Sequence, residues 1–281
     1  MVPISSERAG GFKRINTRLE EIPGLTCDIH GEYTGRRVWI AGMANTWTHC
    51  PTCAEEENAS AAREEQERRQ AELIAGLIKR LAIPPRFQGK TLENFIADTR
   101  AQRSSLEIVR KYVAEFQENR ELGRSLLFIG EPGTGKTHLA CGILDALARS
   151  CRSGLYITVA DLIRRLRATW NRDRSASETE GEIIKKLEGL DLLVVDEIGV
   201  QYGADAEKVQ LFDVLNSRYN AMRPTLLLSN LDLKGVTEYL GERVVDRMRE
   251  GDGRMIVFSG ESYRVKANRL QDAPKVTELT Q

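Results

Sequence analysis

The sequence has no excess of charge of either sign, because Lys and Arg together number 41 and Asp and Glu also number 41. A neutral chain lacks the bulk positive charge that attracts nucleic acid, so DNA binding would have to come from local patches. The sequence also lacks an apolar run of about 18 residues, and its first residues lack the apolar core of a signal peptide. We therefore expect a cytoplasmic protein with no membrane partner.

The chain is 281 residues long, of which 41% are hydrophobic and 29% are charged. This composition is typical of a soluble globular protein. The length leaves room for one large α/β domain and a small appendage.

A glycine-rich stretch organises the chain. Residues 130–137 read GEPGTGKT, follow the apolar run LLFI and lead into a stretch with helical spacing. A strand, a glycine-rich loop and a helix in this order form the context of a phosphate-binding loop. Lys136 would reach the β- and γ-phosphates of ATP, and the Thr137 hydroxyl would ligate Mg²⁺. The candidate nucleotide-binding residues are Gly130, Gly133, Thr134, Gly135, Lys136, Thr137 and His138.

Two later apolar stretches end in polar residues that suit the same chemistry. Residues 190–195 precede Asp196 and Glu197, and residues 224–229 precede Asn230. Ligands bind at the carboxyl ends of the strands in open α/β sheets. We expect Asp196 to hold Mg²⁺, Glu197 to orient or deprotonate the attacking water, and Asn230 to contact the γ-phosphate or that water.

Three cysteines lie in the first 53 residues and suggest a metal centre. Cys27-x-x-His30 and Cys50-x-x-Cys53 are short knuckles with the spacing of a tetrahedral zinc site. Four protein ligands would make this zinc structural. His49, next to Cys50, is an alternative fourth ligand, although His30 fits the knuckle spacing better.

Residues 54–81 are expected to form an exposed helix. Opposite charges recur three or four residues apart, and large apolar residues come only from Leu73 onward. The helix is either simply solvated or binds a partner. The remaining cysteines, Cys141 and Cys151, are expected to be packing residues.

A second strand is expected over residues 155–159, followed by a helix over residues 161–171. Arginines along and just after this helix lie beside Trp170, and together these residues form a local basic patch with a stacking platform. An exposed amphipathic helix explains the same pattern, and both interpretations can hold together. The patch arginines are Arg164, Arg165, Arg167 and Arg172.

Several blocks together resemble the DnaC family of bacterial and phage helicase loaders, which are AAA+ ATPases related to the initiator DnaA. The blocks are GEPGTGKTH, ITVADLI, LLVVDEIGVQ and LGERVVDRMREGDGRMIVFSGESYR, within residues 80–264. The zinc knuckle departs from the expected loader pattern. The resemblance implies a parallel sheet flanked by helices, ATP hydrolysis, self-association through ATP at subunit interfaces, and a hexameric DnaB-type helicase and single-stranded DNA as partners.

The resemblance also implies roles for three arginines. Arg247 matches an arginine finger that reaches a neighbouring subunit's γ-phosphate, with Arg243 as the second candidate, and Arg264 matches a second sensor. Two rival functions remain: a transposition helper ATPase of the IstB type, and a nucleotide-gated binding protein with negligible hydrolysis. The expected organisation is a zinc-binding segment (1–54), a helical linker (55–84), an AAA+ domain (85–270) and a flexible tail (271–281).

Overall fold

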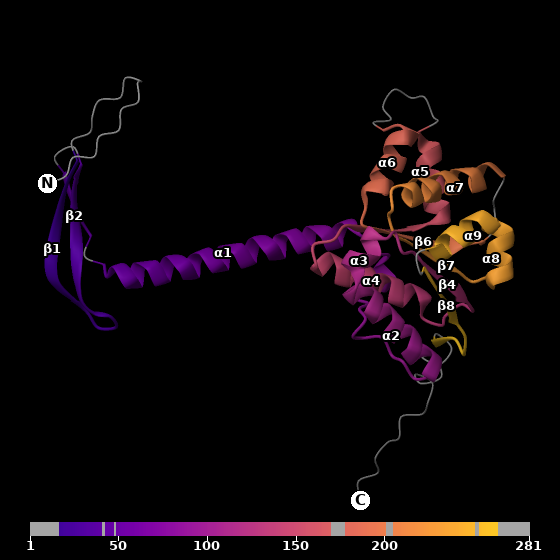
Figure 1. Ribbon diagram of the computed structural model, residues 1–281, viewed down its shortest axis with the longest axis horizontal. Helices are drawn as coiled ribbons and strands as arrows, with labels where there is room; N and C mark the ends of the chain where they lie inside the picture. Colours follow the sequence, from indigo (N-terminus) through magenta and orange to yellow (C-terminus); the bar gives the residue numbers. More distant parts are fainter. Residues whose placement is uncertain are drawn as a thin grey trace, which may run out of the picture. The chain divides into compact units, whose positions relative to one another are not determined.

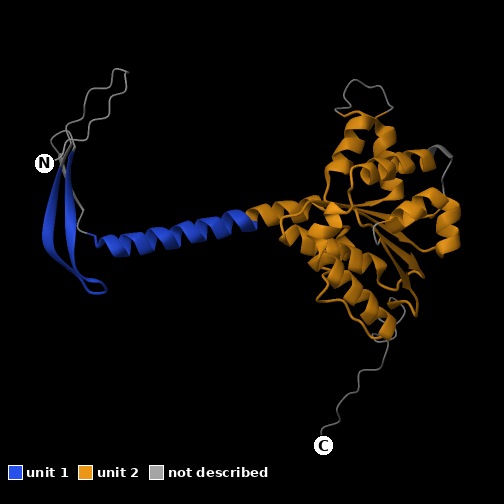
Figure 2. Cartoon of the chain, in the orientation of Figure 1, with its two compact units in different colours: residues 1–71 blue, residues 72–281 orange. Residues whose placement is uncertain are grey.

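The computed structural model describes residues 17–40, 43–47, 49–169, 178–200, 205–250 and 253–263. The chain divides into two units, residues 1–71 and residues 72–281, shown in blue and orange in Figure 2. The boundaries expected between the zinc-binding segment, the linker, the AAA+ domain and the tail, at residues 54, 84 and 270, stay predictions.

The first unit contains an antiparallel sheet with the strand order β1-β2-β3, of which Figure 1 labels β1 and β2. These strands are β1 (Thr17–Cys27), β2 (Gly31–Ile40) and β3 (Met43–Trp47). Cys27 pairs with Gly31 across the turn that contains His30, so the first knuckle forms the end of a hairpin. The sequence indicated the knuckles but not the strands, because this sheet buries little apolar surface: Leu19 in β1 is 61% exposed.

Helix α1 spans Pro51–Arg80, and none of its residues is buried. The exposed helix predicted over residues 54–81 is therefore confirmed. Glu65 forms ion pairs with Arg68 and Arg69, at 2.5 and 2.7 Å, one turn further along. Pairs at this spacing stabilise an exposed helix modestly.

The second unit is built on a parallel sheet with the strand order β5-β6-β7-β4-β8 (Figure 1). Its strands are β4 (Leu126–Gly130), β5 (Gly154–Thr158), β6 (Leu192–Ile198), β7 (Thr225–Ser229) and β8 (Arg254–Phe258). The α/β class expected from the sequence is confirmed. The sequence predicted β4 to β7 to within about two residues and did not single out β8.

Helices cover both faces of this sheet, because successive strand residues point to opposite sides. The helical segments of the unit are η1 (Pro85–Phe87), α2 (Arg100–Ala114), α3 (Phe116–Glu121), α4 (Lys136–Arg149), α5 (Val159–Ala168), α6 (Glu180–Gly189), α7 (Asp205–Asn220), α8 (Leu233–Leu240) and α9 (Glu242–Arg249). In β4, Leu126 and Phe128 pack with α2 and α4, whereas Leu127 and Ile129 pack with α5, α7 and α9.

One buried arginine ties these elements together. Arg218 in α7 is 0% exposed, and burial lowers its pKa to about 9. Its guanidinium donates to Thr225 Oγ1 at 3.0 Å and to the carbonyl oxygens of Leu187, Leu190 and Pro224. It therefore joins the end of α6 to the start of β7.

We expect Arg218→Met to destabilise the protein by about 3 kcal/mol, because several buried carbonyl oxygens would lose their donor. The measurement is the thermal unfolding temperature of the full chain. Arg223→Met is the control, since that arginine is partly exposed and its ion pair with Asp191 is long, at 4.0 Å. Equal effects of the two substitutions would contradict this role.

The structure also bears on the membrane and cysteine expectations. Within the described residues, no helix combines the length and apolarity needed to cross a membrane. Cys141 is buried in α4, as expected of a packing residue. The same expectation for Cys151 is wrong, because that residue is exposed in the turn after α4, with φ of 57°.

Candidate nucleotide site and metal centre

The glycine-rich loop joins β4 to α4, in the strand–loop–helix order that the sequence predicted. Gly133 and Gly135 have φ values of +80° and +105°, which favour glycine. A Cβ atom at Gly133 would lie 2.0 Å from Ser262 Oγ, and one at Gly135 would lie 2.6 Å from the Phe95 ring. The loop is therefore packed between the segment before α2 and the segment after β8.

The Lys136 ammonium group lies against the curled loop. Its Nζ donates to the carbonyl oxygens of Gly130 and Glu131, at 2.6 and 2.7 Å, and the residue is 6% exposed. Thr134 Oγ1 donates to the same Glu131 oxygen at 2.7 Å. The loop thus places a cation next to the N-terminus of α4, where backbone N–H groups favour an anion.

Thr137 and Asp196 come together although 59 residues separate them. Thr137 Oγ1 donates to Asp196 Oδ2 at 3.0 Å, and the Tyr156 hydroxyl donates to the same oxygen at 2.6 Å. A hydroxyl and a carboxylate are the hard oxygen ligands that Mg²⁺ prefers, and Mg²⁺ commonly takes one or two protein ligands beside phosphates. These two side chains therefore fit a magnesium ion bound with a nucleotide.

Glu197 follows Asp196 at an irregularity in β6. Its φ is +64°, and the pairing of β6 with β7 shifts register between Val195 and Ile198. This bulge leaves Glu197 exposed in an otherwise buried strand. Although Glu197 is exposed, incomplete hydration of its carboxylate, followed by the charges of Asp196 and Asp161, raises its pKa. A carboxylate with a raised pKa is suited to accept a proton from water.

Asn230 is exposed directly after β7, the strand next to β6. It therefore lies at the same carboxyl edge of the sheet as Asp196 and Glu197.

His138 lies on the side of the loop that faces the segment before α2. Its Nε2 is 3.0 Å from the Thr91 carbonyl oxygen and 2.9 Å from Asn94 Oδ1, and its ring meets the Phe95 ring edge-on. Burial lowers the pKa of His138, which favours the neutral ring. His138 therefore anchors the 91–95 segment beside the loop.

The two candidate finger arginines lie in α9 in different surroundings. Arg247 donates to Asn216 and stacks on the Tyr219 ring, with its guanidinium carbon 4.6 Å from the ring centre. Arg243 is exposed on a groove that α8 and α9 line. Arg264 lies outside the described residues.

The arginines expected to form a basic patch have acidic neighbours in the described part of the chain. Arg164 pairs with Asp161, Arg165 lies 3.8 Å from Glu178, and Arg167 lies 2.9 Å from Glu207. These pairs reduce the positive charge that the helix offers to DNA. Leu162, Ile163 and Leu166 are buried on the opposite side, and Trp170 and Arg172 lie outside the described residues.

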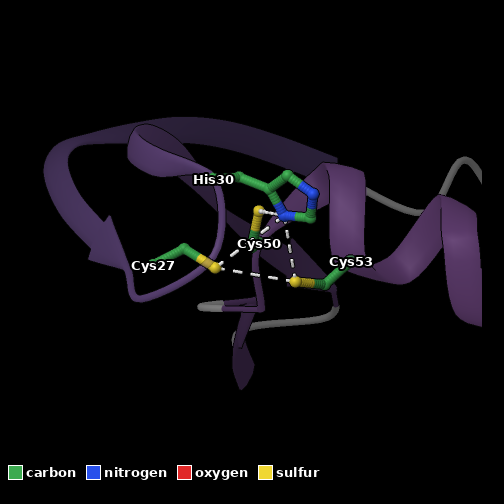
Figure 3. A group of neighbouring side chains, drawn as sticks. All are labelled: Cys27, His30, Cys50 and Cys53. Carbon is green, nitrogen blue, oxygen red and sulfur yellow. Dashed lines mark hydrogen bonds between the residues drawn. The ribbon is translucent and has the colours of Figure 1, made fainter.

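The two cysteine knuckles meet in the first unit (Figure 3). The ligand atoms of Cys27, His30, Cys50 and Cys53 all lie within 4.8 Å of one another. His30 Nδ1 is 3.3 to 3.9 Å from the three sulfurs, and the sulfurs of Cys27 and Cys53 are 3.6 Å apart. Ligands around tetrahedral zinc are separated by about 3.6 to 3.8 Å, so this cluster fits zinc.

Neighbouring groups support this centre and distinguish the two histidines. Glu56 Oε1 lies 3.3 Å from His30 Nε2, in the position of a carboxylate that orients a metal-binding imidazole. Backbone N–H groups of Ile29 and His30 lower the pKa of Cys27 to about 6, whereas the hydrogen bond with Cys27 raises the pKa of Cys53 to about 12, so the metal-free cluster favours the thiolate at Cys27. His49 is outside the cluster, and its Nε2 lies 3.4 Å from Glu57. The geometry therefore favours His30 as the fourth ligand.

We expect about one zinc ion per chain, and we expect a strong chelator to unfold the segment before residue 54 while leaving ATP binding intact. Elemental analysis measures the zinc content, thiol titration follows the unfolding of the cysteine segment, and binding of a fluorescent ATP analogue measures the third effect. His30→Ala should lose the metal, whereas His49→Ala should retain it. Protein purified without chelator that contains no zinc would end the metal hypothesis.

A family model described as IstB-like ATP binding protein matches residues 40–271. The chain belongs to the IstB-like family of ATP-binding proteins.

The resemblance to the DnaC family is confirmed by two relatives of this chain. The chain is 38% identical over 205 residues to the replicative helicase loader DnaC of Escherichia coli strain K12, covering 73% of this chain and 80% of that protein. It is 38% identical over 194 residues to the protein of the same name from Buchnera aphidicola subsp. Acyrthosiphon pisum (strain APS), covering 68% and 77%.

Solved structures share an architecture with most of this chain. The crystal structure of the DnaC helicase loader aligns with a TM-score of 0.55 and 26% identity, covering 63% of this chain and all of that one. The AMPPCP-bound DnaA of Aquifex aeolicus aligns with a TM-score of 0.52 and 19% identity, covering 70% and 59%, and shares the fold. The AAA+ fold expected from the sequence is therefore confirmed.

Sequence reasoning missed four residues that the structure brings to these sites: Tyr156, Phe95, Ser262 and Glu56. For Tyr156 a signal existed, because a tyrosine in a buried strand needs a partner for its hydroxyl. Glu56 follows Cys53 by one turn of α1, and Ser262 lies two residues before Arg264, so their positions near predicted site residues were also signals. Phe95 reaches the loop from a segment distant in sequence, and no local pattern indicated it.

Proposed function

We propose that this ATP-binding protein hydrolyses ATP and uses the cycle to deliver a hexameric DnaB-type replicative helicase onto single-stranded DNA. The observation that carries the proposal is the 38% identity across 80% of the Escherichia coli protein named replicative helicase loader DnaC. The gathering of Lys136, Thr137 and Asp196 beside one loop supports ATP as the ligand.

In this proposal the residues of one subunit hold the nucleotide. The loop and Lys136 bind the phosphates, while Thr137 and Asp196 hold Mg²⁺. The metal would neutralise charge on the phosphate oxygens. Glu197 orients or deprotonates the attacking water, and Asn230, at the neighbouring strand end, contacts that water or the γ-phosphate.

Assembly would complete the site. Arg247 or Arg243 on α9 would reach a nucleotide held by a neighbouring subunit, and Arg264 would act as the second sensor. ATP at such an interface would drive self-association, with an open spiral as the expected form. The zinc-binding segment and α1 would contact the helicase. The α5 arginines and Trp170 would contact single-stranded DNA.

The test is reconstitution with a hexameric replicative helicase. We expect the purified protein to capture the helicase and, with ATP, to load it onto circular single-stranded DNA. Steady-state ATP turnover with and without that DNA tests hydrolysis. Capture with no loading in ATP would contradict the loader function, and absent turnover would favour a nucleotide-gated binding protein.

The family model's description keeps an IstB-type transposition helper as the second candidate. Parallel captures with a purified helicase and with a purified transposase separate the two functions, because a helper of this type would retain the transposase rather than the helicase.

A further inference from the structure

Tyr156 is held at both its backbone and its ring. It lies in β5, one of the two edge strands of the five-stranded sheet, and its backbone N–H donates to the Leu81 carbonyl oxygen at 2.8 Å. Its side chain is 6% exposed and packs in the core layer that contains α4. The position of the phenol ring is therefore fixed, and its hydroxyl cannot reach a different partner without a change in the packing.

The partner of its hydroxyl is the carboxylate that faces Thr137. Tyr156 donates to Asp196 Oδ2 at 2.6 Å, and Thr137 Oγ1 donates to the same oxygen at 3.0 Å. The other oxygen, Oδ1, accepts the backbone N–H of Glu197 at 2.6 Å. Donors on both oxygens fix the rotation of the carboxylate. Of the two side-chain donors, Tyr156 is buried, whereas Thr137 is only half-buried.

The phenol is the donor in this pair, because an ionised carboxylate can only accept a hydrogen bond. The hydrogen bond of 2.6 Å between the Tyr156 hydroxyl and Asp196 Oδ2 therefore points its proton at the carboxylate.

We propose that Tyr156 is a positioning residue for the metal–nucleotide complex, because its hydroxyl holds Asp196 in the orientation that faces Thr137. The inference rests on the proposed binding of ATP with Mg²⁺. A carboxylate that must ligate a small ion next to a hydroxyl performs best when its rotation is already restricted. Loss of such an outer hydrogen bond commonly weakens metal binding by about tenfold or more.

The experiment measures the binding of a fluorescent ATP analogue as MgCl₂ is titrated. Tyr156→Phe should raise the Mg²⁺ concentration for half-maximal binding by about tenfold and leave metal-free nucleotide binding unchanged. Tyr112→Phe is the matched control, since Tyr112 is 5% exposed and its hydroxyl donates to the Arg124 carbonyl oxygen at 2.9 Å. It should lower the unfolding temperature comparably and leave the Mg²⁺ dependence unchanged.

The outcomes separate the inference from the function on which it rests. An unchanged Mg²⁺ dependence in Tyr156→Phe, or the same shift in Tyr112→Phe, overturns the positioning role while Mg²⁺-dependent binding by the wild type stands. If wild-type binding shows no Mg²⁺ dependence, the proposed metal assignment fails first and takes the inference with it. Tyr156→Met, which also lacks the hydroxyl, serves as the second variant if the phenylalanine protein does not fold.

Discussion

Lys136→Ala is expected to weaken ATP binding by about 100-fold, because it removes the buried cation that would pair with the β- and γ-phosphates. Equilibrium binding of a fluorescent ATP analogue measures this loss. Lys185→Ala is the matched control, since it removes one positive charge from an exposed lysine that pairs with Glu188. That control should bind ATP as the wild type does.

Glu197→Gln provides the contrasting variant, because its carboxylate is expected to act on water rather than on the nucleotide. It should bind ATP normally and slow turnover. The pKa of Glu197 is raised, and only the deprotonated form accepts a proton. Wild-type turnover should therefore fall as the pH falls through the pKa of Glu197, which lies above the pKa of an ordinary carboxyl group. Equal loss of ATP binding in Lys136→Ala and Glu197→Gln would contradict this division of roles.

Arg247→Ala is expected to suppress hydrolysis by a factor on the order of 10³ while ATP binding to each subunit stays nearly unchanged. The reason is that an arginine finger stabilises charge on a nucleotide held by the neighbouring subunit. ATP-dependent assembly should also weaken. Steady-state ATP turnover and sedimentation measure the two effects.

Mixing experiments test the action in trans. Arg247→Ala and Lys136→Ala proteins, each inactive alone, should regain activity together, because a mixed interface pairs an intact pocket with an intact arginine. If the subunits co-assemble and no activity returns, the trans role of Arg247 is wrong. The same mixture with Arg243→Ala then tests the exposed alternative. The contacts of Arg247 with Asn216 and Tyr219 make this comparison necessary, since its loss could also loosen the packing of α9 on α7.

Local patterns were sufficient for most of the ATPase fold. Strands β4, β6 and β7 are short, almost continuous apolar runs buried on both faces, so their sequences differ clearly from the charged helices around them. The phosphate loop was equally clear, because its glycines and Lys136 are adjacent in sequence. The zinc ligands were predictable for the same reason, since each knuckle is a contiguous motif.

The tertiary structure decided what depends on distant contacts. It distinguished His30 from His49, because only folding of the hairpin brings His30 to the sulfurs of the second knuckle. It brought Tyr156 to Asp196 by pairing β5 with β6, a contact across 40 residues that no local pattern encodes. Side-chain identity sets which groups can bind a metal or a phosphate, whereas strand pairing sets which of those groups share one site.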